Sequence, residues 1–202
     1  MTHSNPLALL AAVGLETHQP FVIVDSEFTS WEGSLQRNWS GPNEHREVAQ
    51  IAAIKLDPRQ NMAETETFDV FVKPQINTQL SEYFMDLTQI RQADVDGGLL
   101  FAEAMQQFYD FCEQDKLQVW SYGREDIVFR ENAALYNHAY PSTRDYHDFR
   151  DVLTAFGHDP SQYSSGTVFR AVGLEVDGHV HNPLHDCRSQ AAYLRYFWQQ
   201  GQ

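Results

Sequence analysis

The stretch FVIVDSEF, residues 21–28, constrains the fold more than any other part of the chain. Its first four residues are apolar and mostly β-branched, which predicts a buried β-strand. Asp25 and Glu27 occupy positions i and i+2, so both side chains point from the same face of that strand. Two neighbouring carboxylates repel each other unless a positive charge lies between them, and a divalent cation held by oxygen ligands is a common solution. The stretch therefore predicts part of a metal site, with a strand that ends in two solvated acids as the alternative.

The length of 202 residues and the hydrophobic content of 42% are typical of one globular domain. We expect a lead-in segment over residues 1–20 and a folded domain over residues 21–200. The apolar run from Leu7 to Val13 predicts a short packing helix, because no Lys or Arg precedes it as in a signal peptide. No apolar run approaches the roughly 20 residues that cross a bilayer. With only Cys112 and Cys187, no disulfide framework is expected, and the cytoplasm is the predicted location.

The formal net charge of −14 limits the partners of this chain. Long nucleic-acid duplexes are held mainly by Lys and Arg contacts to phosphate, and the chain has 14 such residues against 28 acids. This composition argues against a protein that grips long duplexes by charge. Short single strands held at a metal centre are compatible with it, because a bound cation reverses the local charge. The charge leaves the oligomeric state open between a monomer and a homodimer.

Hydrophobic patterning along the rest of the chain predicts an α/β protein with a mixed five-stranded sheet flanked by helices. Further strands are expected over residues 47–56, 65–73, 117–122 and 146–149, the first two of these as antiparallel neighbours. Helical patterning covers residues 81–90, 101–112, 126–135 and 152–156. The last helix is expected to begin at Pro183 with Asn182 as its N-cap. Residues 29–46 are expected to form an ordered loop close to the acidic pair.

Further metal ligands are available where the strand over residues 117–122 stops before Gly123. Asp126 falls in the first turn of the helix that follows, and catalytic groups of open α/β sheets gather at such strand ends. Acids near helix starts also complement the helix dipole, which is the alternative interpretation of Asp126. Glu125 is a second candidate ligand that spacing alone does not exclude.

The segment HNPLHD, residues 181–186, is the other source of ligands. Asp186 lies one turn into the last helix, on the flank of its apolar stripe, so it can face another element. His181 precedes the N-cap in a loop, where an imidazole can titrate near neutral pH. A solvated histidine and a dipole-stabilising acid are the alternatives. A zinc site of His179, His181 and His185 is a weaker hypothesis, because the carboxylates supply the oxygen ligands typical of Mg²⁺ or Mn²⁺.

These residues occur in the order of a known motif. The chain resembles the DEDDh 3′–5′ exonuclease superfamily, which has Asp-x-Glu on its first strand, an Asp in mid-chain and His-x-x-x-x-Asp near its end. The matching residues are Asp25, Glu27, Asp126, His181 and Asp186. Neighbouring segments resemble the branch of RNA-trimming exoribonucleases and their bacterial relatives, namely VDSEFTSWEG, EVAQI, FVKP, LTQI and SYG.

Three residues depart from the pattern of this branch. Tyr122 stands where Trp usually precedes the glycine, and His185 stands where an Asp often precedes the final Asp. Phe28 replaces the Thr that is common after Asp-x-Glu in other branches. None of these changes removes a ligand of the family, but the aromatic changes bear on the pocket for the base.

The resemblance implies a ribonuclease-H-like fold and hydrolysis by two divalent cations, Mg²⁺ or Mn²⁺, about 4 Å apart. It assigns Asp25, Glu27 and Asp186 to one cation, and Asp25 with Asp126 to the other. It makes His181 the general base, a role that an unperturbed pKa of about 6.5 suits.

The resemblance also implies a binding pocket for the terminal nucleotide. Leu87 and Ile90 would wedge against the terminal base, and Phe28 and Thr29 would line its pocket. Ordinary packing of a short helix is the alternative for Leu87 and Ile90. Stacking on such side chains tolerates any base sequence, as a trimming enzyme requires.

The expected function is therefore 3′–5′ exonuclease activity on short single strands with a free 3′ end, RNA favoured, with release of nucleoside 5′-monophosphates and no membrane partner. A DNA-directed proofreading or repair exonuclease of the same fold is the first alternative, because no reader of the 2′-hydroxyl is recognisable. A non-catalytic interaction protein that kept the fold is the second.

Overall fold

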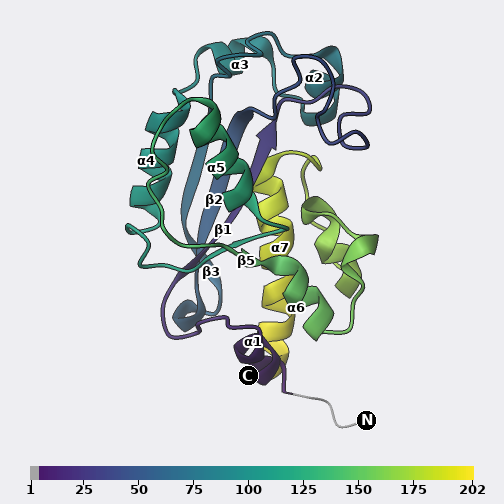
Figure 1. The fold of residues 1–202 in the computed structure, drawn as a ribbon. Coiled ribbons are helices and arrows are strands. Elements are labelled where there is room, and N and C mark those ends of the chain that lie inside the picture. Colours follow the sequence, from purple (N-terminus) through teal and green to yellow (C-terminus); the bar gives the residue numbers. More distant parts are fainter. Residues whose placement is uncertain (1–4) are drawn as a thin grey trace.

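A computed structural model describes residues 5–202 and shows a five-stranded mixed sheet (Figure 1). The strands are β1 (Phe21–Phe28), β2 (Val48–Asp57), β3 (Ala63–Phe71), β4 (Val119–Ser121) and β5 (His147–Asp148). Their order across the sheet is β3-β2-β1-β4-β5. β2 pairs antiparallel with both β1 and β3, whereas β1, β4 and β5 run parallel. The expected antiparallel pairing of the second and third strands is confirmed.

Helices cover both faces of the sheet. The α-helices are α1 (Pro6–Ala12), α2 (Glu82–Thr88), α3 (Gln92–Asp96), α4 (Phe101–Phe111), α5 (Glu125–Leu135), α6 (Phe149–Ala155) and α7 (Pro183–Gly201). Three 3₁₀ helices also occur within residues 5–202: η1 (Pro58–Gln60), η2 (Pro160–Gln162) and η3 (Ser165–Val172). Figure 1 shows α2 and α3 gathered at one end of the molecule, beyond the end of β1.

The alternation of side chains along β1 assigns each face of the sheet to its helices. Phe21 and Ile23 are fully buried in a cluster with residues of α1, α6 and α7. Val22 and Val24 point to the opposite face and are buried with residues of α4 and α5. A buried leucine, isoleucine or phenylalanine contributes about 2 kcal/mol of hydrophobic stabilisation, so both faces hold the central strand firmly.

The last helix begins where the sequence predicts. The side chain of Asn182 accepts a hydrogen bond from the backbone N–H of His185, and Pro183 occupies the first turn. The short N-terminal helix also forms as expected: Leu10 of α1 is buried against α7 in the cluster that contains Leu194 and Trp198.

Other elements differ from the sequence-based expectation. The fourth strand is limited to Val119–Ser121, and α5 begins at Glu125, one residue before the expected start. Helices α3 and η3 were not predicted, because their sequences are short and carry no long apolar period. Among residues 5–202, no helix combines the length and the apolar character needed to cross a membrane.

Candidate active site

Three carboxylates meet at the end of β1. One oxygen each from Asp25, Glu27 and Asp186 lies within 4.8 Å of the other two. Asp25 and Glu27 continue the face of β1 that carries Phe21 and Ile23, and α7 covers this face with Asp186 in its first turn. A register shift in the β1–β2 ladder between Glu27 and Phe28 ends the regular pairing at this point.

Two residues of η3, Ser165 and Gly166, hold the Asp186 carboxylate in place. The hydroxyl of Ser165 donates a hydrogen bond to Asp186 Oδ2 at 2.8 Å. A Cβ atom on Gly166 would lie only 2.3 Å from Asp186 Oδ1, so a side chain at this position would displace the carboxylate. The Oδ1 atom is buried and has no hydrogen-bond partner within residues 5–202. An unpartnered buried carboxylate oxygen beside two other acids fits a divalent cation.

Burial and mutual repulsion perturb all three carboxylates. Burial, followed by the charge of Asp186, raises the pKa of Asp25 and that of Glu27 well above their usual range. Burial raises the pKa of Asp186 to about 6, although the hydrogen bond from Ser165 opposes this shift. A bound cation would relieve the repulsion and favour the ionised forms. The electrostatics of the cluster therefore fit a metal site.

His181 lies next to this cluster. Its Nδ1 atom is 4.0 Å from Glu27 Oε1, and its side chain is half-exposed. The backbone of His181 is in the left-handed region with φ of 70°, a conformation that non-glycine residues adopt at some energetic cost. Burial, followed by the charge of His179, lowers the pKa of His181. The imidazole is therefore neutral at pH 7 and able to accept a proton.

The structure does not bring Asp126 to this cluster. The Asp126 carboxylate is held by Arg124, whose Nε and Nη2 atoms both donate to it at 2.7 Å. Glu125 is not part of the converging group either, although its charge contributes to the raised pKa values of Asp25 and Glu27. The physical reason is that α5 packs on the face of β1 that carries Val22 and Val24, where Ser26 donates a hydrogen bond to Glu125, whereas the cluster lies on the face covered by α7.

The four residues expected to bind the terminal nucleotide have different surroundings. Thr29 is 2% exposed and ties the ends of the 29–46 loop together, because its hydroxyl donates to the carbonyl of His45 and accepts from the N–H of Glu47. Ile90 is 4% exposed and packs with residues of α2 and α3. Phe28 and Leu87 are partly exposed at the same end of the molecule. The interpretation as ordinary packing therefore fits Ile90.

The three late histidines point to separate partners. His179 Nε2 lies 2.9 Å from the carbonyl oxygen of Leu87, which links its loop to α2. Both ring nitrogens of His185 lie 3.2 Å from backbone carbonyl oxygens, those of Asp177 and Gly166. A zinc site would need their ring nitrogens to converge, and in the described part of the chain the group of potential ligands that converges is the carboxylate cluster.

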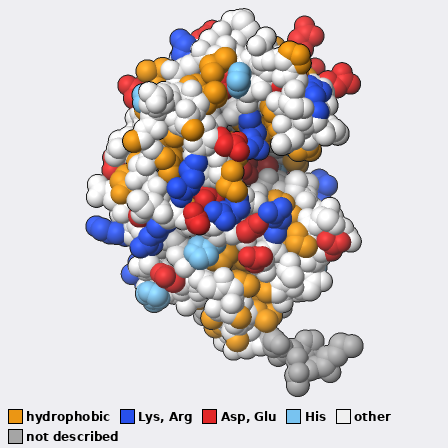
Figure 2. Space-filling view, in the orientation of Figure 1, with side chains coloured by type: hydrophobic (Ala, Val, Ile, Leu, Met, Phe, Trp, Pro, Cys, Tyr) orange, Lys and Arg blue, Asp and Glu red, His pale blue; other side chains and the backbone are white. Residues whose placement is uncertain are grey.

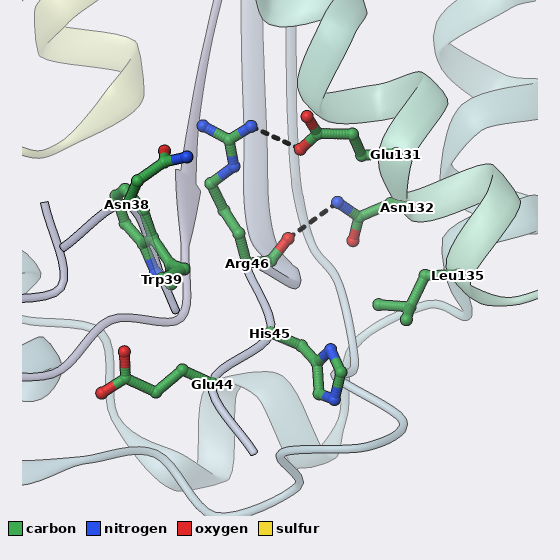
Figure 3. A pocket seen from close by; sticks show the side chains of 8 residues that line it. All are labelled: Asn38, Trp39, Glu44, His45, Arg46, Glu131, Asn132 and Leu135. Atoms are coloured by element: carbon green, nitrogen blue, oxygen red, sulfur yellow. Dashed lines mark hydrogen bonds and ion pairs between the residues drawn. The ribbon is translucent and has the colours of Figure 1, made fainter. Parts of the chain in front are cut away.

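A pocket of about 240 Å³ lies between the 29–46 loop and α5 (Figure 3). Its residues are Asn38, Trp39, Glu44, His45, Arg46, Glu131, Asn132 and Leu135. The guanidinium of Arg46 lies 5.4 Å from the ring centres of both Phe28 and Trp39 and forms an ion pair with Glu131. Phe28 directly follows Glu27 on β1 and packs against Trp39, so this pocket lies near the end of the strand that carries Asp25 and Glu27. Figure 2 shows basic and acidic side chains alternating across the middle of this face of the molecule.

Several supporting residues were missed by sequence reasoning. Ser165 and Gly166 hold Asp186, and Ser26 donates a hydrogen bond to Glu125. Ser26 was overlooked because it lies between the two acids of β1 and points to the opposite face. The SSG segment that contains Ser165 and Gly166 lacks any periodic signal, so only the folded chain reveals its role.

The chain is similar to known exonucleases in sequence. The RNase_T exonuclease family model matches residues 22–194. Human 3′-5′ exoribonuclease 1 is 30% identical over 179 residues, which cover 84% of this chain and 49% of that protein. The rat 3′-5′ exoribonuclease 1 is 25% identical and also covers 84% of this chain. The chain thus spans about half the length of these two relatives.

Solved structures share the fold. The nuclease domain of 3′hExo, a DEDDh family member bound to rAMP, superposes with a TM-score of 0.77 at 24% identity, covering 91% of this chain and 94% of that one. Exonuclease I of E. coli, in complex with a dA16 oligonucleotide, gives a TM-score of 0.64 at 16% identity over 90% of this chain and 42% of that one. The expected ribonuclease-H-like α/β fold is confirmed.

Proposed function

Since the chain belongs to the RNase_T exonuclease family, we propose that it is a metal-dependent 3′–5′ exonuclease that releases nucleoside 5′-monophosphates from single-stranded nucleic acid. The observation that carries the proposal is the meeting of Asp25, Glu27 and Asp186 within 4.8 Å. The unpartnered Oδ1 of Asp186 and the adjacent His181 support it.

The carboxylates of Asp25, Glu27 and Asp186 would hold divalent cations. Their oxygen-only ligand set favours Mg²⁺ or Mn²⁺ over softer metals. When bound, such cations polarise the phosphodiester and lower the pKa of water in the site. Ser165 and Gly166 keep the Asp186 carboxylate directed at the cluster, so the site is organised before substrate arrives.

His181 would accept the proton of the attacking water. Its imidazole is neutral at pH 7 because burial lowers its pKa, and the partly exposed side chain can pass the proton to solvent. The carboxylate of Glu27, with Oε1 4.0 Å from His181 Nδ1, would stabilise the imidazolium that forms. The proton then leaves to bulk water and the base is regenerated.

The substrate would be a short single strand with a free 3′ end. The partly exposed Phe28 meets Trp39 edge-to-face and lies under the Arg46 guanidinium, which supplies aromatic and cationic surface for an unpaired base and its phosphate. RNA is favoured because the exoribonuclease relatives match over most of this chain. DNA is the alternative substrate, since the same fold occurs in a complex with a DNA oligonucleotide. The two buried free cysteines fit a reducing cytoplasm.

A 5′-labelled single-stranded RNA incubated with the protein and Mn²⁺ tests the proposal. We expect a ladder that shortens from the 3′ end, with nucleoside 5′-monophosphates as products. A 3′-phosphate or a circular RNA should resist digestion, and a DNA strand of the same sequence measures the sugar preference. Equal cleavage of circular and linear strands would contradict exonuclease action.

Asp25→Asn provides the matched variant. Activity should fall at least about 1000-fold, equivalent to about 4 kcal/mol of activation free energy, because Asp25 is central to the cluster. Asp110→Asn, which changes an exposed acid on α4, is the control and should leave activity unchanged. Full activity of a folded Asp25→Asn protein would favour the alternative of a non-catalytic interaction protein.

A further inference from the structure

The segment of residues 177–182 leads into α7, and its first residues are fixed by the buried imidazole of His185. The carbonyl oxygen of Asp177 lies 3.2 Å from His185 Nδ1, and that of Gly166 lies 3.2 Å from His185 Nε2. Gly178 has φ of +139°, and a Cβ atom at this position would lie only 2.4 Å from His185 Nδ1. Glycine therefore allows the segment to pack directly on the ring, which joins it to η3 and to the first turn of α7.

His181 lies further along this segment, in a strained turn. The backbone N–H of Asn182 donates to the carbonyl of His179 at 3.0 Å, and His181 between them has φ of 70°. The turn directs the imidazole to the carboxylate cluster, with Nδ1 at 4.0 Å from Glu27 Oε1. A half-exposed side chain on a strained turn keeps one position only where the surrounding structure holds the turn.

His179 connects this turn to another part of the chain. Its Nε2 atom lies 2.9 Å from the carbonyl oxygen of Leu87, which is 92 residues away and in the last turn of α2. The last carbonyl groups of a helix have no partner within the helix, so the imidazole N–H satisfies one of them. Figure 1 shows the start of α7 at the end of the molecule where α2 lies.

Helix α2 is a firm support for this contact. Phe84 of α2 is 1% exposed, in a cluster with residues of α3 and β2. At the start of the helix, the hydroxyl of Ser81 donates to the carbonyl of Ser30, two residues beyond the end of β1. The contacts therefore run from β1 through α2 to His179, and the turn that follows returns to β1 at Glu27.

From this geometry we infer that His179 is a positioning residue for His181. Its ring N–H braces the 177–182 segment against α2 and thereby sets the imidazole that accepts the proton of the attacking water. The inference rests on the proposed function, in which His181 is the base, and gives a role to a histidine outside the family motif. A displacement of about 1 Å in a reacting group can lower a rate about 100-fold, so such a brace affects turnover without contact to the substrate.

Two substitutions separate the hydrogen bond from the imidazole ring. His179→Gln keeps an N–H donor at a similar reach, whereas His179→Leu removes the donor. On single-stranded RNA with Mn²⁺, we expect kcat to fall about ten-fold in His179→Leu and at most about two-fold in His179→Gln, with KM unchanged in both. His138→Leu, which changes an exposed histidine after α5, is the matched control and should keep wild-type kinetics.

Nuclear magnetic resonance of the metal-free protein, labelled with ¹³C in its histidine rings, reports on His181 without turnover. His181→Asn identifies the signal. We expect one sharp ring signal in wild type and His179→Gln, and a broadened or divided signal in His179→Leu, because the released turn samples several positions. Mn²⁺ binding should stay as in wild type, and melting temperatures should change by less than about 3 °C, because His179 is exposed and bonds to α2 rather than to the carboxylates.

Several results would overturn the inference. A raised KM with unchanged kcat in His179→Leu would make His179 a contact to the substrate. An equal fall of kcat in both variants would mean that the ring itself is required. Loss of Mn²⁺ binding or a markedly lower melting temperature would make the contact structural. Wild-type kcat, or an unchanged His181 signal, in a folded His179→Leu protein would show that the contact does not position His181.

Asp25→Asn separates this inference from the proposed function. If Asp25→Asn abolishes activity while His179→Leu behaves as wild type, the exonuclease stands and the role of His179 is wrong. If Asp25→Asn leaves activity unchanged, the proposed function itself is wrong, whatever the signal of His181 shows.

Discussion

Two groups of buried carboxylates in this protein have opposite surroundings. The structural group is Glu47, Asp57 and Asp126, and the site group is Asp25, Glu27 and Asp186. Each acid of the structural group has matched donors. Arg59, for example, donates to both oxygens of Asp57 and holds the pKa of that carboxyl well below its usual range. Acids of the site group repel one another and have raised pKa values.

Glu47 is the best example of the structural group. It is fully buried, and its oxygens accept hydrogen bonds from the backbone N–H groups of three consecutive residues, 75–77, and from the Tyr136 hydroxyl. It thereby joins the start of β2 to α5 and to the segment after β3. Burial of an acid is therefore not a sign of a metal site by itself. The absence of matched donors is the feature that separates the two groups.

The largest effect on stability should come from the structural group. Glu47→Gln removes the charge that four donors share, and we expect it to lower the free energy of unfolding by about 3 kcal/mol. Urea denaturation of the metal-free protein measures the change. Tyr136→Phe removes one of these donors and should cost about 1 kcal/mol. If Glu47→Gln lowers the free energy of unfolding by less than Tyr136→Phe does, Glu47 does not belong to the structural group.

Substitution of an acid in the site group should raise the free energy of unfolding of the metal-free protein. Asp25→Asn removes one of several repelling charges, so the metal-free protein should gain about 2 kcal/mol in the free energy of unfolding at pH 7.5. The same variant should lose the rise in melting temperature that millimolar Mn²⁺ gives the wild type. A destabilised Asp25→Asn protein would place Asp25 with the structural acids.

The pH dependence follows from the burial of these acids. Burial raises the pKa of Glu125 to about 7 and that of Asp186 to about 6, whereas unfolded carboxyl groups titrate near pH 4. Between these values the folded metal-free protein binds more protons than the unfolded chain, so its stability falls as pH rises. Histidines with lowered pKa values oppose this trend. Their contribution is removed when the free energy of unfolding of Asp25→Asn is subtracted from that of wild type at the same pH, because both proteins contain the same histidines.

That difference should therefore be small at pH 5 and grow to about 2 kcal/mol at pH 7.5 in EDTA. Denaturation at several pH values measures it. Saturating Mn²⁺ should reverse the sign, because the cation binds the ionised carboxylates of the wild type. A difference that does not change with pH would mean that the site group is not electrostatically strained.

The smallest effects should come from the pocket beside the site. Arg46→Gln removes the cation that lies over the rings of Phe28 and Trp39 and should weaken single-stranded RNA binding about three-fold. Glu131→Gln frees Arg46 from its exposed partner and should strengthen binding by a similar factor. Fluorescence anisotropy at two salt concentrations, in Ca²⁺ to prevent cleavage, measures both. If both variants change RNA affinity in the same direction, Arg46 does not contribute to RNA binding.

Much of the fold could be predicted from local sequence. The apolar run into Asp25 and Glu27 identified the central strand, and Asn182 with Pro183 marked the start of α7. These features depend on interactions within a few residues, which local patterns encode. The 3₁₀ helix η3 was missed because Ser165 and Gly166 take their positions from contacts with Asp186, 20 or more residues further on.

The sequence by itself determined that Asp25 and Glu27 share one face of a buried strand and that Asp186 lies in the first turn of a capped helix, because strand and helix geometry follow from local periodicity. Only the tertiary structure decided which partners the two acids after β4 take. The turn at Gly123 and the start of α5 direct Asp126 to Arg124, whereas Glu125 accepts a hydrogen bond from Ser26. A shift of one residue in a helix start rotates every side chain by about 100°, and spacing along the chain does not record that rotation.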